Sequence, residues 1–191
     1  MEGLARLARL ANLDFQPDMS IQPIRLLGDP VLRTKCRSVK VAGSPTVQQT
    51  IEDLRDTLSD FRSRKGFGRG IAAPQIGVSE RIIFVDFEYS GPLINPKILA
   101  RSKGMFELWD DCFSFPDLLV RVRRHTGIEV VFLDAEGKRQ RLQARGALSE
   151  LLQHEIDHID GILALDRAIS PRHIILRSEL GRFEGLHRKE R

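Results

Sequence analysis

The sequence predicts a single α+β domain, and three observations support this fold class. Short apolar stretches with the alternation of strands lie in the middle of the chain, between residues 82 and 142. Segments with the apolar spacing of helices lie on both sides of them, an arrangement typical of α+β proteins. The length of 191 residues corresponds to one domain. We expect an N-terminal extension over residues 1–20, the domain over residues 21–181, and a basic C-terminal tail over residues 182–191.

The composition excludes several classes of protein. Hydrophobic residues make up 41% of the chain and charged residues 29%, which is the balance of a globular protein rather than a disordered one. The richest apolar run covers residues 82–85, far short of the roughly 18 residues that span a bilayer, so we expect no membrane association. Two cysteines are too few for a disulfide scaffold. We therefore expect a cytoplasmic protein, although the helical spacing of apolar residues within residues 1–20 leaves an organellar targeting segment as an alternative.

The first predicted element is a helix over residues 45–65. Ser44 and Pro45 are typical of a helix start. The apolar residues that follow at spacings of three and four are Val47, Ile51, Leu54, Leu58 and Phe61. The helix ends before Gly66, and residues 66–77 contain too many glycines for a regular element. We expect a loop there, in which the backbone adopts unusual angles or another group approaches it closely.

The remaining elements are strands followed by helices. The predicted strands cover residues 82–86, 118–122 and 128–133, and residues 134–137 form a turn into a partner strand that runs through Leu142. The spacing becomes helical from Gly146 to Asp160, and Gly161 stands where a C-terminal cap belongs. Ser170 and Pro171 then predict a last helix, which contains Ile174, Ile175 and Leu180.

The helix over residues 146–160 carries the strongest chemical signal, the segment HEIDH at residues 154–158. Histidines four residues apart lie one turn from each other on the same helix face, so His154 and His158 can reach one metal ion. Glu155 is close enough to accept a proton from a water on that ion without being a ligand. Both histidines share a helix stripe with Ala147 and Leu151 and should face the interior. The alternative is a pair of structural histidines in the core.

The third ligand cannot be assigned from this motif alone. Catalytic metal sites usually have three protein ligands, and the candidates are Cys112, an acidic residue or another histidine. A lone cysteine is more often a small buried hydrophobic residue than a ligand.

Three separated segments resemble the motifs of peptide deformylases. They are the glycine-rich residues 68–77 (GRGIAAPQIG), the cysteine segment 110–114 (DDCFS), and residues 153–158 (QHEIDH) with Gly161 after them. Residues 28–33 (GDPVLR) also resemble the entry segment of the family. The resemblance covers about residues 21–175 and identifies the chain as a member of the family. It implies antiparallel sheets around a central metal-binding helix.

The resemblance also implies an activity and a set of site residues. The activity is hydrolytic removal of the formyl group from the N-terminal formyl-methionine of nascent polypeptides, with release of formate. One divalent metal ion, usually Fe²⁺ and replaceable by Zn²⁺ or Ni²⁺, is held by Cys112, His154 and His158. Glu155 transfers the proton, while the side-chain amide of Gln75 and the backbone N–H of Phe113 stabilise the developing oxyanion. The implied substrate-binding residues are Gly68, Gly70, Ile71 and Asp111, and Gly70 lets the substrate backbone pair as an added strand.

The cysteine segment departs from the usual Glu-Gly-Cys-Leu-Ser of the family. We expect Asp110 to pair with one of three arginines, Arg121, Arg123 or Arg124. Asp111 stands where the family has glycine, so it puts substrate range and rate in question more than metal binding. Its carboxylate should be held by Arg69 or by one of the same three arginines.

The net charge of +4 and three basic clusters raise the question of a nucleic-acid partner. The clusters cover residues 121–124, 138–145 and 182–191, and we expect mostly solvated surface, with the tail as a candidate for binding the ribosome. With one Trp and one Tyr the chain has few candidate side chains on which nucleic-acid bases could stack, and we expect no specific DNA partner. Alternative functions are a deformylase-like protein with altered substrate or low activity, a zinc endopeptidase, and a basic ribosome- or RNA-binding module. The last would leave all three motifs unused.

Overall fold

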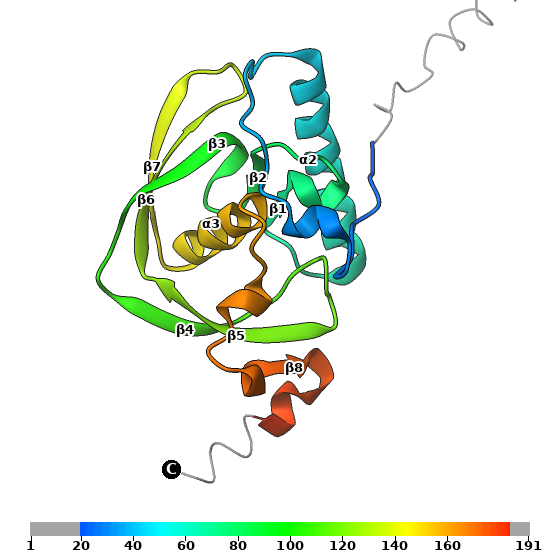
Figure 1. The fold of residues 1–191 in the computed structure, drawn as a ribbon, viewed down its shortest axis with the longest axis vertical. Helices are drawn as coiled ribbons and strands as arrows, with labels where there is room; N and C mark the ends of the chain where they lie inside the picture. Colours follow the sequence, from blue (N-terminus) through cyan, green and yellow to red (C-terminus); the bar gives the residue numbers. More distant parts are fainter. Residues whose placement is uncertain (1–19, 184–191) are drawn as a thin grey trace, which may run out of the picture.

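A central helix lies between two antiparallel sheets in the computed structural model, which describes residues 20–183 (Figure 1). The five-stranded sheet has the order β1-β2-β3-β6-β7, and the three-stranded sheet has the order β4-β5-β8. The strands are β1 (Gly70–Ala72), β2 (Ile82–Asp86), β3 (Ser90–Arg101), β4 (Met105–Asp110), β5 (Leu118–His125), β6 (Gly127–Leu133), β7 (Arg139–Arg145) and β8 (Ile174–Leu176). Every pairing between them is antiparallel. The predicted α+β class is therefore confirmed.

Helix α2 (Pro45–Lys65) covers the side of the five-stranded sheet that lies away from the central helix (Figure 1). The five apolar residues predicted to form its stripe are all buried. Ser44 occupies the N-cap position, although its side chain makes no capping hydrogen bond, and Pro45 begins the first turn. Gly66 ends the helix in the left-handed conformation, with φ of 76°. The predicted boundaries of this helix are confirmed.

Helix α3 (Gly146–Ile159) is the central helix, and every residue from Leu148 to Ile159 is buried. Ala147, expected on the inward stripe, is exposed because it lies in the first turn, ahead of the enclosed part. Gln153 fastens the helix to the end of β5, since its side chain accepts from the backbone N–H of His125 at 3.0 Å and donates to the carbonyl of His125 at 3.0 Å. At the other end, the backbone N–H of Cys36 donates to the carbonyl of Ile159 at 2.9 Å.

Two element predictions were wrong. Residues 66–77 are not a loop throughout, because Gly70–Ala72 pair with β2 and Ala73–Ile76 form a 3₁₀ turn. Glycine has a low strand propensity, so the local sequence does not predict this strand, and only its pairing with β2 defines it. Ile174 and Ile175 belong to strand β8 rather than to a last helix, since they pair with Val120 and Leu119. Ser170 and Pro171 do begin a helical turn, the 3₁₀ helix Pro171–His173, but the turn ends where the β-branched Ile174 and Ile175 pair with β5.

Other boundaries differ or go untested. Strands β3 and β4 were not predicted, and Pro92 and Pro96 within β3 are residues that argue against a strand. The N-terminal extension expected over residues 1–20 lies outside the described residues except for residue 20, and so does nearly all of the basic tail. No helix within residues 20–183 is long and apolar enough to cross a membrane.

Candidate active site

Three potential metal ligands converge where the cysteine segment meets α3. Cys112, two residues after β4, places its Sγ 3.2 Å from Nε2 of His158, and that nitrogen lies 3.1 Å from Nε2 of His154. The three ligand atoms all lie within 4.8 Å of one another, and the three residues are buried. One thiolate and two imidazoles form a donor set that suits a borderline or soft divalent ion. The residues present therefore fit the metal ion that the motifs predict.

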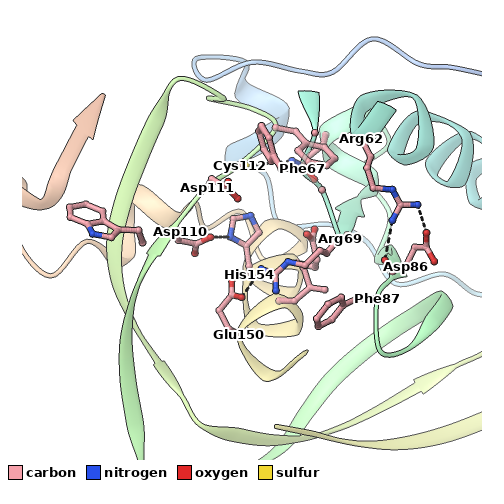
Figure 2. Close-up of a pocket in the computed structure, with 18 residues that line it drawn as sticks. Arg62, Phe67, Arg69, Asp86, Phe87, Asp110, Asp111, Cys112, Glu150 and His154 are labelled. Carbon is pink, nitrogen blue, oxygen red and sulfur yellow. Dashed lines mark hydrogen bonds and ion pairs between the residues drawn. The ribbon is translucent and has the colours of Figure 1, made fainter. Parts of the chain in front are cut away.

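A buried carboxylate orients the first histidine. Nδ1 of His154 lies 2.9 Å from Oδ1 of Asp110, which favours a proton on Nδ1 and leaves the Nε2 lone pair directed toward Cys112 (Figure 2). Burial alone would raise the pKa of Asp110, but His154 and Arg124 together lower that pKa to about 2. Asp110 therefore stays ionised over the whole physiological range.

Asp110 belongs to a buried chain of alternating charges. NH2 of Arg124 lies 3.1 Å from Asp110, and NH1 of the same guanidinium lies 2.5 Å from Asp157, the aspartate of the HEIDH segment. The expected pairing of Asp110 with one of three arginines is thus confirmed for Arg124. That arginine is only 4% exposed, so it is not part of a solvated basic surface. Arg121 and Arg123 instead contact Glu107.

Gln75 lies next to the cysteine of the candidate metal centre. Its Oε1 accepts from the backbone N–H of Ala72 at 2.9 Å, which fixes the orientation of the amide. Its Nε2 consequently points inward, 3.5 Å from Sγ of Cys112 and 3.4 Å from Oγ of Ser114. The result is a positioned N–H donor beside the cysteine.

Phe113 anchors the backbone next to Cys112. Its ring stacks on Phe61 of α2 with centroids 3.8 Å apart. It also fills the space beside Gly68, where a Cβ would come within 2.6 Å of the ring. Only glycine fits at residue 68, which also has a φ of 129°.

Glu155 is a buried carboxylate that immediately follows His154. It is 3% exposed, and its Oε2 has no hydrogen-bond partner among residues 20–183. Burial raises the pKa of Glu155 to about 7, even though His154 lowers it. Gly70 lies against this carboxylate, because a Cβ there would stand 2.9 Å from Oε1. An unpartnered carboxylate with such a pKa can both take up and release a proton near neutral pH.

A cavity of about 460 Å³ gives access to these groups (Figure 2). Its lining includes most of the predicted site residues: Gly68, Gly70, Gln75, Asp111, Cys112, Phe113, His154 and Glu155. The side chain of Ile71 is not among them, because it is fully buried in the core between β1 and α2. Its side chain therefore anchors the strand and does not line the cavity.

The partner expected for Asp111 was wrong. Its Oδ2 contacts NH2 of Arg177 at 2.9 Å, and Arg69 contacts Glu150 instead. Arg177 follows β8, which the sequence placed in a helix, so this pairing was not foreseeable. Its guanidinium also lies 4.6 Å from the ring centroid of Phe67. Among described residues other than glycine, only Asn95 has a positive φ, so Asp111 shows no need for the backbone freedom of glycine.

Sequence reasoning also missed Glu150 as a residue of the cavity. It is four residues before His154 on α3 and therefore on the same helix face. That spacing was a usable signal, since a charged residue on a buried face calls for an explanation.

The fold and this centre together define a metal-dependent hydrolase. A cysteine and two histidines lie close together beside a cavity, next to a buried carboxylate without a hydrogen-bond partner in residues 20–183 and an oriented amide donor. These are the kinds of group that a metal-dependent attack of water on a carbonyl group requires.

Comparison with known proteins identifies the family. The polypeptide deformylase family matches residues 21–173. The peptide deformylase of Dictyoglomus thermophilum is 38% identical over 152 residues, which cover 78% of this chain and 94% of that protein. The peptide deformylase of Rhizobium meliloti is 37% identical over 154 residues, which cover 78% of this chain and 85% of that protein. The chain belongs to the polypeptide deformylase family.

Solved structures agree with this assignment. The crystal structure of peptide deformylase from Thermotoga maritima superposes with a TM-score of 0.73 at 32% identity, and the match covers 79% of this chain and 99% of that one. The structure of a peptide deformylase from Synechococcus elongatus in complex with actinonin also gives a TM-score of 0.73, at 33% identity, and covers 81% of this chain and 82% of that one. The protein is therefore a metal-dependent enzyme that removes the formyl group from N-terminal formyl-methionine, and formyl-methionine peptides are its substrates. An RNA-binding module is not favoured.

Proposed function

We propose that deformylation takes place in the cavity described above, with Cys112, His154 and His158 as the ligands of one Fe²⁺ ion. The observation that carries this proposal is the convergence of three buried ligand atoms within 4.8 Å of one another. Zn²⁺ or Ni²⁺ can replace iron in such a mixed thiolate and imidazole set. The bound ion supplies Lewis acidity, which acidifies water and polarises the formyl carbonyl.

Glu155 moves the proton in this proposal. Its unpartnered Oε2 accepts a proton from the attacking water, and the same oxygen delivers it to the nitrogen of the leaving amine. A pKa raised by burial to about 7 supports both halves of this transfer at neutral pH.

Gln75 and Phe113 stabilise the charge that develops on the formyl oxygen. The amide of Gln75 is already oriented by Ala72, and the backbone N–H of Phe113 is held by the packing of its ring on Phe61. Donors that are fixed in advance need no reorganisation during the reaction, which is why they lower the barrier.

The substrate backbone pairs with the free edge of β1, the terminal strand of its sheet. The backbone carbonyl of Arg69 accepts from the N–H of Asp86, so the peptide groups of residue 69 point toward β2. The backbone N–H of Ala72 points away from β2, toward the side chain of Gln75. Because strand residues alternate, the peptide groups of Gly70 share the side of Ala72 and are open to an added strand. Gly68 and Ile71 hold this edge in place, and Asp111 lies at the cavity wall.

Exchange of the carboxylate tests the proton transfer. Glu155→Ala should keep its metal and lose roughly 10²–10⁴-fold in turnover of a formyl-methionine peptide. Glu52→Ala, an exposed glutamate on α2, is the matched control and should retain full activity. Formate release by Glu155→Ala within a few-fold of the parent enzyme would refute the assignment.

Elemental analysis tests the ligands independently of activity. Cys112→Ala, His154→Ala and His158→Ala should each lose the metal, because two ligands hold an ion too weakly against water and buffer. Cys36→Ala is the control, since Cys36 is buried in a core cluster that does not contain Cys112. Near-full occupancy in any one of the three ligand variants would contradict the ligand set.

We further propose that the enzyme works in the cytoplasm, where nascent chains are made, and that the basic tail of residues 182–191 binds the ribosome. Four basic residues against two acidic ones support this attraction to RNA. Deletion of residues 184–191 spares Phe183, whose ring packs on Trp109 with centroids 5.2 Å apart. The deletion should leave peptide deformylation unchanged and weaken co-sedimentation with ribosomes at low salt. Unchanged co-sedimentation would contradict the proposal.

A further inference from the structure

One wall of the cavity is an ion pair. NH2 of Arg69 lies 2.8 Å from Oε2 of Glu150, whose side chain is only 5% exposed, while that of Arg69 is 37% exposed (Figure 2). Arg69 immediately precedes β1, and Glu150 lies on α3 one turn before His154. Glu150 therefore lies on the same face of α3 as His154, and the ion pair is next to the proposed metal ligands.

The surroundings make this wall amphipathic. The guanidinium of Arg69 lies 5.3 Å from the ring centroid of Phe87, and both residues line the cavity together with Leu151. An unbranched side chain can lie against the ring and the leucine while its end meets the guanidinium. Within residues 20–183, the side-chain hydrogen bond of Arg69 goes to Glu150, which uses one of its five N–H donors.

The first side chain of a substrate enters the cavity that this wall lines. It branches from the Cα atom, which is separated from the formyl carbon by the amide nitrogen alone. A substrate whose formyl group lies at the ligand cluster consequently has this side chain in the same cavity.

We propose that the Arg69–Glu150 pair determines the side-chain preference of the enzyme and selects a first residue with a hydrogen-bond acceptor near its end. This inference rests on the proposed function. A side-chain amide oxygen is a full acceptor, the thioether of methionine a weak one, and the methylene of norleucine none. When a purely apolar side chain packs against the pair, the guanidinium loses hydrogen bonds to water and gains no other acceptor.

The test measures kcat/KM for three formyl peptides that differ only in their first residue, which is Met, Gln or norleucine. In the parent enzyme Met should be preferred to norleucine by at least about threefold. The double variant Arg69→Leu/Glu150→Leu replaces the pair by an apolar wall and leaves no buried charge without a partner. Its ratio of Gln to norleucine should fall at least about tenfold below that of the parent, the size expected for one hydrogen bond to a charged group.

The control removes a comparable ion pair away from the cavity. Arg141 and Glu129 pair at 2.9 Å between β7 and β6, and Arg141→Leu/Glu129→Leu should keep the parental ratios. If the double variant at the cavity does not fold, Glu150→Gln serves instead, because it neutralises the carboxylate while preserving its shape, and it should lower the ratio of Gln to norleucine.

Two results distinguish the failure of this inference from that of the proposed function. Ratios equal within twofold in the parent and the cavity variant, or a parental preference for norleucine over Met, would overturn the role of the pair while formyl-methionine is still hydrolysed. A metal-loaded parent that releases no formate from the formyl-methionine peptide would overturn the proposed function and this inference with it.

Discussion

Substitution of Gly70 by alanine tests how tightly β1 packs against Glu155, the carboxylate proposed to transfer the proton. The added Cβ would stand 2.9 Å from Oε1 of Glu155, 3.1 Å from its Cγ and 3.1 Å from Cδ1 of Leu151. Ordinary contacts of a Cβ begin near 3.4 Å, so Glu155 or the strand has to move by up to about 0.5 Å. Gly70 has no positive φ, and the whole effect is therefore steric.

A displacement of this size should be visible in two assays. Misplacement of a catalytic group by 1 Å costs about 100-fold in rate, so Gly70→Ala should lose on the order of tenfold in kcat while it retains its metal by elemental analysis. Overpacking should also lower the free energy of unfolding by about 1–3 kcal/mol in urea denaturation. Both quantities should change together, because one contact causes them.

Gly43→Ala is the matched control for this variant. No atom lies within 4 Å of a Cβ at residue 43, and this glycine has no positive φ. Its turnover should equal that of the parent and its stability should change by less than about 1 kcal/mol. A Gly70→Ala enzyme with kcat within twofold of the control would refute the reasoning that Gly70 gives Glu155 its space.

Three further predictions concern stability and reactivity. Gly161→Ala adds a Cβ 2.7 Å from the backbone oxygen of Arg33, whereas the Cβ of Gly66→Ala, at nearly the same φ, has no atom within 4 Å. In urea denaturation, Gly66→Ala should lower the free energy of unfolding by about 1–2 kcal/mol and Gly161→Ala by clearly more. Equal losses in the two variants would contradict the clash. Burial raises the pKa of Cys36 to about 11, so alkylation at pH 7.5 should leave it unmodified in the folded protein, and a modified Cys36 in the mass spectrum of native protein would disprove this. Arg124→Met removes the cation that Asp110 and Asp157 share and leaves these buried carboxylates with only His154 and Arg167, respectively; the free energy of unfolding should fall by about 3–5 kcal/mol, whereas a loss below 1 kcal/mol would show that the charge chain does not stabilise the fold.

Residues whose environment depends on nearby sequence were predictable. The stripe of α2 and the inward histidines of α3 follow from spacing, because one helix carries the whole pattern. Cys112 was different, since no spacing relates it to His154 and His158, and only resemblance to a family singled it out. The structure brings it to them through β4, a strand that the sequence did not predict.

Residues whose environment depends on distant segments were not predictable. The pairing of Arg177 with Asp111 requires β8, which forms only because β5 provides a partner. Gly70–Ala72 become a strand for the same reason, next to β2. The burial of Arg124 depends on two aspartates that come from separate elements. Contacts between segments that are distant in the sequence determine the environments of these residues, and the local sequence does not reveal such contacts.

The proposed ligand atoms come from two segments that are far apart along the chain, and this has a consequence for biosynthesis. Cys112 and His158 are separated by 46 positions, and the helix that carries both histidines is held at its end by the backbone of Cys36. A growing chain that stops before residue 158 contains at most two of the three proposed ligands, Cys112 and His154. Tight metal uptake therefore has to wait until nearly the whole domain has been translated. The binding energy of the ion then adds to a late stage of folding, so tight metal binding distinguishes chains that extend past residue 158 from shorter ones.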